Sequence, residues 1–261
     1  MKEYWKYRIP PFRLSDELYH VGTQNGPTYL LDTCEGIVLI DTGYPQTLYL
    51  VLENIRVLGF DPYSIKHIIH SHGHIDHMGG TRALVELTGA RTYIGRGDED
   101  AAAGRNELNA AREVDCVYEE PFEPDVIISD GDVLSFGETE IRFVSTPGHT
   151  IGTMSMFFDV HVGGKAYKAG MFGGAGLNTL TDEYLEKYGL SYDMREMYLE
   201  SIEKLLKEKV EFHIGNHLGD NGSPEKMLHT DDEENPFLRQ NTYYEFLEHK
   251  KEKAMKLFNK I

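Results

Sequence analysis

Histidines gather in one short segment of this chain. The sequence contains twelve histidines, and five of them lie between positions 67 and 77. The apolar segment 65–71 is expected to form a strand, and it leads directly into the motif HGHIDH. A strand that ends in a tight turn can direct the polar side chains of this motif into one small volume, namely His72, His74, Asp76 and His77. Nitrogen and carboxylate ligands at this density suit zinc or another borderline divalent metal, so we expect a metal site where this strand ends rather than a solvated polar loop.

Two later histidines occupy the same kind of position. His149 follows the predicted strand 140–145 through a Pro-Gly turn, and His217 follows the predicted strand 210–214. Because loops that follow strands collect at a sheet edge, we expect both rings to lie near the first cluster. His213 is an alternative to His217, but it lies inside the strand, and we therefore favour His217.

The remaining histidines of the first cluster have a simpler interpretation. His67 and His70 lie within the predicted strand 65–71. We expect them to be buried, hydrogen-bonded side chains, and a supporting role behind the metal ligands is the alternative.

The order of predicted elements favours two sheets with helices outside them, within a single domain that spans 1–261. No internal repeat and no linker rich in Ser, Gly or Pro divides the chain. Helices are expected at 46–58, 79–88, 193–209 and 236–260. Strands are expected at 18–24, 28–34, 36–41, 65–71, 91–94 and 210–214. The segment 125–146 should contain two or three more strands, and 153–159 and 165–168 should form a hairpin around Gly163-Gly164.

Charge and composition exclude several classes of partner. The formal net charge is −17, which disfavours binding to nucleic acid and to anionic membranes, since both require clustered Lys and Arg. The chain begins without a signal peptide and has no apolar run of membrane-spanning length, so we expect a cytoplasmic protein. Cys34 and Cys116 are then expected to be free thiols. The acidic runs 98–100 and 231–234 are expected to be solvated.

These motifs resemble the metallo-β-lactamase superfamily. The resemblance covers roughly 18–220 and rests on VLIDTG at 38–43, HGHIDH with Gly79-Gly80, Gly131-Asp132, PGHT at 147–150 and His217. It implies an α+β fold, a four-layer αββα sandwich of two mixed sheets flanked by helices, with the metals at one edge. It also implies that Asp41 braces the site through hydrogen bonds. The resemblance implies a first metal held by His72, His74 and His149, and a second held by Asp76, His77 and His217.

One position departs from most hydrolases of that family. They carry an aspartate that bridges both metals, whereas this chain reads YKAGMFGG at 167–174, where Gly170 or Met171 takes that place. The chain therefore looks closest to the β-lactamase subclass with His-His-His and Asp-His-His sites. Without the bridging carboxylate, we expect the second metal to bind more weakly than the first. The glycines of 170–176 could admit a substrate to the backbone or could simply make the loop flexible.

The resemblance implies a metal-dependent hydrolase of small molecules. Two zinc ions are the expected cofactor, and iron or manganese is also compatible with these ligands. Paired metals acidify water for attack on an ester, lactone, amide or related bond. Asp76 is the expected catalytic residue, which orients that water and handles its proton. A di-iron redox protein and a non-catalytic metal-binding module are the alternatives, and the residues do not indicate an oligomeric state.

Overall fold

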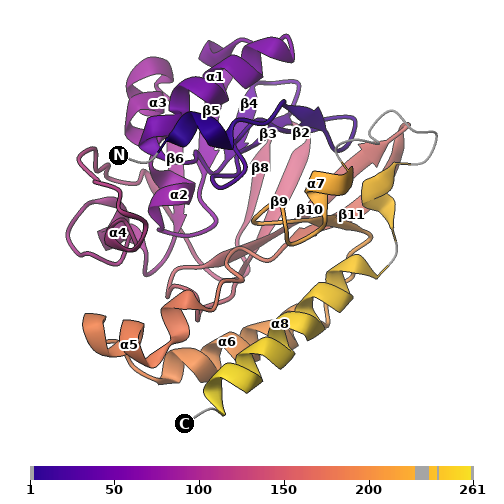
Figure 1. Ribbon diagram of the computed structural model, residues 1–261. Coiled ribbons are helices and arrows are strands. Elements are labelled where there is room, and N and C mark those ends of the chain that lie inside the picture. The colour runs from indigo at the N-terminus through magenta and orange to yellow at the C-terminus, as the bar shows by residue number, and fades with distance from the viewer. Residues whose placement is uncertain (1–2, 227–234, 240, 260–261) are drawn as a thin grey trace.

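Two mixed β-sheets form the centre of the molecule. The computed structural model describes residues 3–226, 235–239 and 241–259 (Figure 1). The first sheet contains, in spatial order, β1 (Phe12–Arg13), β2 (Leu18–His20), β3 (Tyr29–Asp32), β4 (Ile37–Ile40), β5 (Ile65–Ile69), β6 (Arg91–Gly95) and β7 (Val126–Ile128). The second contains, in spatial order, β12 (Phe212–Ile214), β11 (Lys165–Met171), β10 (Met154–Val162), β9 (Thr139–Ser145) and β8 (Val133–Phe136). Each sheet is therefore built from its own continuous stretch of the chain.

The direction of the strands decides where the loops meet. In the first sheet β1 to β4 pair antiparallel, and β4, β5, β6 and β7 pair parallel. Parallel neighbours end at the same edge, so the segments that follow β4, β5 and β6 lie beside one another. These segments carry Asp41, the HGHIDH motif and Asp98.

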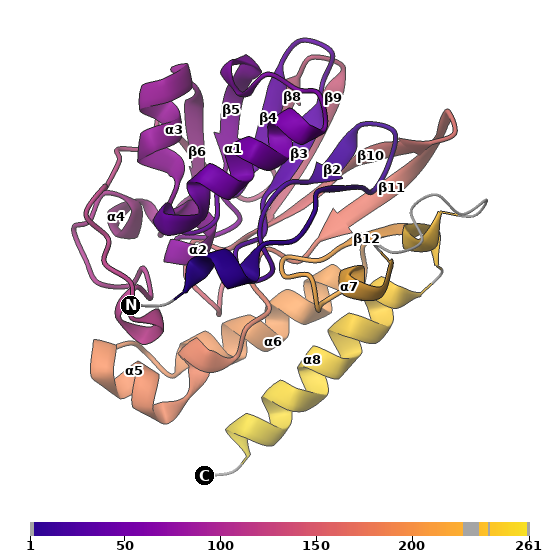
Figure 2. The same cartoon turned by 45° about the horizontal axis from the view of Figure 1, so that its top comes forward.

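Helices cover both outer faces, which confirms the predicted four-layer αββα sandwich (Figures 1 and 2). On the first sheet, α1 (Leu48–Val57) and α3 (Thr81–Thr88) bury Val51, Ile55 and Leu84 against strand residues. On the second sheet, α6 (Asp193–Leu205) and α8 (Thr242–Phe258) do the same with Ile202 and Leu247. Between the sheets lies a core of inward-facing side chains that includes Tyr29, Val38, Phe143, Phe158, Met171 and Phe212.

Four short helices complete the described structure. They are α2 (Ile75–Met78), α4 (Glu99–Ala102), α5 (Asp182–Tyr188) and α7 (Ser223–Lys226). The helix predicted at 79–88 begins only at Thr81, because the separate turn α2 precedes it. Single turns of 3-10 helix form at Tyr4–Tyr7, Pro45–Thr47, Pro62–Ser64, Arg112–Val114, Asn178–Leu180 and Pro236–Leu238.

The hairpin β10–β11 turns where the sequence predicts it. Val162 pairs with Lys165, so only Gly163 and Gly164 lie in the turn. Their φ angles are 58° and 78°, a left-handed pair that suits a two-residue turn between twisted strands and that glycine adopts without steric cost. Both strands are longer than predicted, and β11 continues to Met171 at the edge where the histidines lie.

The prediction of one helix over 236–260 is wrong. Pro236–Leu238 is a single 3-10 turn, in which the side chain of Asn235 accepts a hydrogen bond from the N–H of Phe237. Arg239 is then extended, and Asn241 has a φ of 67°, so the chain cannot continue as a helix before Thr242.

Three smaller expectations concern the chain's surface and thiols. Cys34 is exposed and Cys116 is buried, and both are free, as predicted. The acidic run 231–234 lies outside the described residues. Among the residues that are described, none of the helices has the length and apolarity that crossing a bilayer requires.

Candidate metal centre

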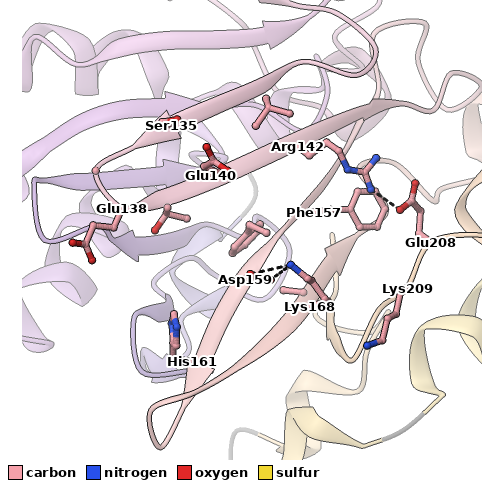
Figure 3. A pocket seen from close by; sticks show the side chains of 15 residues that line it. Ser135, Glu138, Glu140, Arg142, Phe157, Asp159, His161, Lys168, Glu208 and Lys209 are labelled. Atoms are coloured by element: carbon pink, nitrogen blue, oxygen red, sulfur yellow. Dashed lines mark hydrogen bonds and ion pairs between the residues drawn. The ribbon is translucent and has the colours of Figure 1, made fainter.

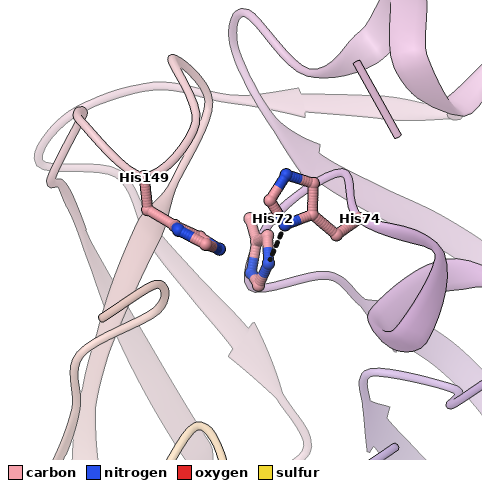
Figure 4. A group of neighbouring side chains, drawn as sticks. All are labelled: His72, His74 and His149. Carbon is pink, nitrogen blue, oxygen red and sulfur yellow. Dashed lines mark hydrogen bonds between the residues drawn. The ribbon is translucent and has the colours of Figure 1, made fainter. Parts of the chain in front are cut away.

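The first three predicted ligands converge at the edge where β5 and β9 end. His72 and His74 lie between β5 and α2, and His149 lies in the turn between β9 and β10. All three side chains are buried, and their rings point toward one another (Figure 4). Nε2 of His72 is 3.1 Å from Nδ1 of His74, and the ring centroid of His149 is 4.7 Å from that of His72 and 4.6 Å from that of His74.

The other three predicted ligands form a second group beside the first. Nε2 of His77 lies 3.3 Å from Nε2 of His217 and 3.4 Å from Oδ2 of Asp76. His217 Nε2 and Asp76 Oδ2 are 3.7 Å apart. The His77 side chain is fully buried, whereas that of His217 is 42% exposed, so this group is open to solvent on one side. The rings of His72 and His77 are 4.1 Å apart, which makes the two groups immediate neighbours.

These separations fit divalent metals with tetrahedral ligands. A zinc ion with bonds of about 2.0–2.1 Å holds its ligand atoms about 3.4 Å apart. The contacts of 3.1 to 3.7 Å within the two groups have this spacing. Two imidazole nitrogens or a nitrogen and a carboxylate oxygen meet in each contact, and this donor set suits zinc.

Burial keeps the first group ready to bind a cation. It lowers the pKa of His74 to about 4 and lowers the pKa values of His72 and His149 well below their ordinary range. All three rings are therefore neutral at neutral pH, and the neutral imidazole is the form that binds a metal.

Charge dominates the second group instead. Burial alone would lower the pKa of His77, but Asp76 and Asp41 raise it to about 10. Burial would likewise raise the pKa of Asp76, but His77 and His217 lower it below its ordinary value. Without a metal, His77 is thus an imidazolium held between two carboxylates.

Asp41 braces the second group, as the resemblance implies. Its carboxylate accepts hydrogen bonds at 2.8 Å from Nδ1 of His77, from the backbone N–H of Ser71 and from the Ser71 hydroxyl. Asp41 has a φ of 63°, which is uncommon for a residue with a side chain, and these bonds hold it there. The Nδ1 contact leaves Nε2 of His77 for a metal.

The glycine-rich loop supports the first group. Nδ1 of His72 donates to the carbonyl of Gly173 at 2.8 Å, and Nδ1 of His149 donates to that of Gly176 at 2.9 Å. A Cβ on Gly173 would lie 2.0 Å from the carbonyl oxygen of Met154, and one on Gly176 would lie 2.7 Å from the His149 ring. Glycine is needed here so that the backbone can approach the ligands, and not only for flexibility.

No carboxylate lies between the two groups within the described residues. A Cβ on Gly170 would point at Val210 and Phe157, away from the ligands. The Met171 side chain instead points into the core between the sheets, with its sulfur 3.9 Å from Nδ2 of Asn216, and the same nitrogen donates to the Ser71 hydroxyl.

Asp98 corrects the expectation that 98–100 is a solvated acidic run. Its side chain is buried, and its carboxylate accepts hydrogen bonds from Gly73, Thr150 and Gly152. The sequence predictions did not identify it, because nothing in its local pattern shows which loops will surround it.

Three other histidines of the predicted strands, His67, His70 and His213, lie outside the two groups. His70 is buried, donates from Nδ1 to the carbonyl of Tyr93 and accepts from Thr81 at Nε2. His67 is only half-buried and hydrogen-bonds the Tyr93 hydroxyl, so its predicted burial is incomplete. His213 packs against Tyr243 and Phe246, which supports the preference for His217.

One cavity of the described structure lies apart from the candidate ligands. Its volume is about 680 Å³, it lies on the outer face of the second sheet, and none of the six candidate ligands lines it (Figure 3). Four of its charged side chains form two ion pairs, Arg142 with Glu208 and Lys168 with Asp159. A much smaller space of about 20 Å³ touches His74 and His149, and Tyr184 and Met194 are among the side chains that enclose it.

Comparison with known proteins agrees with this geometry. The family model described as "Metallo-beta-lactamase superfamily" matches residues 21–162. The metallo-β-lactamase FEZ-1 of Legionella gormanii superposes with a TM-score of 0.87 at 26% identity, over 97% of this chain and 96% of that one. The subclass B3 metallo-β-lactamase BJP-1 of Bradyrhizobium japonicum gives 0.89 at 25% identity, over 99% and 97%.

A curated relative with a different activity is also similar. The N-acyl homoserine lactonase of Bacillus thuringiensis is 28% identical over 159 residues, which is 52% of this chain and 59% of the lactonase. The chain spans between half and two thirds of the length of the first curated relatives that it matches, 53% and 59%.

Proposed function

The chain belongs to the metallo-β-lactamase superfamily, and from this we propose that it is a metal-dependent hydrolase of small molecules with two zinc ions as its cofactor. The observation that carries the proposal is the convergence of six candidate ligands in two groups, His72, His74 and His149, and Asp76, His77 and His217. Iron and manganese remain compatible with the same donors.

The two groups of candidate ligands have different proposed roles. When bound, two divalent cations acidify water and polarise a carbonyl or phosphoryl oxygen. The three buried histidines are neutral donors that need no deprotonation. Asp76 is ionised and only 17% exposed, so a carboxylate oxygen can accept a hydrogen bond from a reacting water and orient it. Asp41 keeps the ring of His77 in place during these changes of charge.

The proposed substrates are esters, lactones, amides and related bonds. The lactonase and β-lactamase names of the relatives support cyclic ester and amide substrates as the first to test. The net charge of −17 supports a small-molecule substrate over a nucleic acid or an anionic membrane. We keep a cytoplasmic location and a single domain over 1–261 as further proposals.

Metal content and hydrolysis together test this function. Protein purified without chelator should contain about two zinc ions per chain by mass spectrometry, and it should hydrolyse at least one member of a panel of aryl esters, lactones and β-lactams. His74→Ala should reduce that rate by at least about a hundredfold while circular dichroism stays unchanged. His249→Ala, on the exposed face of α8, is the matched control and should retain the rate. A His74→Ala variant that hydrolyses the panel as fast as the control would overturn the proposal, and visible absorbance from bound iron would favour a redox protein instead.

A further inference from the structure

One buried carboxylate connects the two loops that carry the first three histidines. Asp98 follows β6 and is 4% exposed. Its Oδ2 accepts from the N–H of Gly73 at 2.7 Å and from the hydroxyl of Thr150 at 2.6 Å, and its Oδ1 accepts from the N–H of Gly152 at 2.9 Å. Gly73 lies between His72 and His74, and Thr150 follows His149.

We propose that Asp98 is a positioning residue that sets the geometry of the first metal site by fixing these two loops to each other. The loop with His72 and His74 follows a strand of the first sheet, and the loop with His149 joins two strands of the second. The three rings can therefore meet only if the two sheets keep one relative placement at this edge. Asp98 bonds to both loops next to the ligands, although its own oxygens are not part of either group of candidate ligands. The inference rests on the proposed metal-dependent function.

The surroundings of Asp98 are shaped for this carboxylate. A Cβ on Gly73 would lie 3.0 Å from the Asp98 Cβ, and one on Gly152 would lie 2.6 Å from the Asp98 Cγ. Both positions must be glycine for their N–H groups to reach the oxygens. All three partners are donors, so an asparagine of the same shape would turn an NH₂ group toward a donor and lose at least one bond.

Asp98 and Asp41 serve different sites. Asp41 bonds directly to His77 of the second group, and Asp98 bonds to the backbone and side chain beside the first group. The chain thus has two buried aspartates, each beside one group. Loss of Asp98 should therefore weaken the first metal selectively.

The test measures metal affinity in variants that keep one site each. His217→Ala leaves the three-histidine site intact, and His74→Ala leaves Asp76, His77 and His217. Asp98→Asn is added to each, and apo-protein is titrated with Co²⁺ against a chromophoric chelator, with the visible Co²⁺ spectrum recorded. Substituting a residue that orients metal ligands typically costs 10–100-fold in affinity. We expect a loss of about that size, with an altered spectrum, in the His217→Ala background, and a change under about threefold in the His74→Ala background.

Controls separate positioning from general destabilisation. Asp125→Asn is the control variant. The Asp125 carboxylate accepts hydrogen bonds at 2.8 Å from the N–H and the hydroxyl of Thr92, which lies on β6, the strand that precedes Asp98, and its loss should leave both metal affinities unchanged. Thr150→Val removes one donor to Asp98 and should weaken the first site, whereas Thr150→Ser keeps the hydroxyl and should restore it; this pair decides the question if Asp98→Asn does not fold. Equal losses at both sites, or no loss at the first, would overturn the inference. Because the readout is metal affinity, a wild-type protein that binds Co²⁺ but hydrolyses nothing would count against the proposed function alone.

Discussion

Lowering the pH should weaken metal binding to Asp76, His77 and His217 long before it weakens binding to the three-histidine group. The pKa of His77 is raised to about 10, so the imidazolium is the stable form at every pH below that value when no metal is bound. A metal must displace this proton to reach Nε2, whereas Nδ1 keeps its hydrogen bond to Asp41. The apparent affinity should then fall about tenfold, or 1.4 kcal/mol, for each pH unit below 10.

The same reasoning gives a different result for the first group. The pKa of His74 is lowered to about 4, so this ring is already neutral at pH 6 and has no proton to lose. Between pH 10 and pH 7 the proton at His77 should lower the apparent metal affinity of the second site by about a thousandfold, or about 4 kcal/mol. The apparent metal affinity of the first site should not change over the same range. This difference is an additional reason for the second metal to bind more weakly.

Calorimetry can count the protons directly. The variants His217→Ala and His74→Ala are titrated with zinc at pH 7.5 in buffers of different ionisation enthalpy. About one proton should be released per metal in His74→Ala, where the second group remains, and almost none in His217→Ala. Equal proton release from both variants, or a second-site affinity that does not change between pH 6 and pH 9, would refute the assignment of charge to His77.

Two further substitutions test how the backbone places the ligands. Gly148→Ala should lower the metal content from two toward one and reduce the melting temperature. Gly148 precedes His149 and has a φ of 136°, and a Cβ at this position would lie 2.5 Å from the Cβ of Tyr198. A variant that still contains two metals by mass spectrometry would contradict this prediction. Tyr29→Phe should lower the free energy of unfolding by about 1–3 kcal/mol in urea titrations, because the buried hydroxyl donates to the carbonyl of Gly215 at 2.6 Å and its loss leaves that oxygen unpaired. A change below about 0.5 kcal/mol would show that water replaces the lost bond.

The candidate ligands could be predicted because their signals are local. Each histidine of the two groups follows a strand, and a strand end with a tight turn is visible in a few consecutive residues. The two-residue turn at Gly163-Gly164 was predictable for the same reason. The order of strands and helices indicated two sheets, although it did not indicate which strands pair or in which direction.

The parts that were missed depend on distant contacts. Asp98 looks like a surface acid because its partners, Gly73 and Thr150, are 25 and 52 residues away in the chain. The break before α8 lies at Arg239, which is extended, and at Asn241, which has a left-handed φ, and neither conformation is visible in the helical spacing of the apolar residues. The sequence alone did not decide whether Gly170 or Met171 takes the place of the bridging aspartate. That choice required the packing, which shows that a Cβ on Gly170 would point at Val210 and Phe157.

The contiguous origin of each sheet has a consequence for assembly. Residues up to Ile128 build the first sheet, and residues from Val133 to Ile214 build the second. The first half of the chain supplies four of the six candidate ligands, and the second half supplies one histidine to each group. Neither half can complete a group alone, so each bound metal would link the two halves of the chain. A chain emerging during synthesis would acquire full metal affinity only after its second half had packed against the first. A substitution that weakens the contact between the two halves would therefore first lower the metal content.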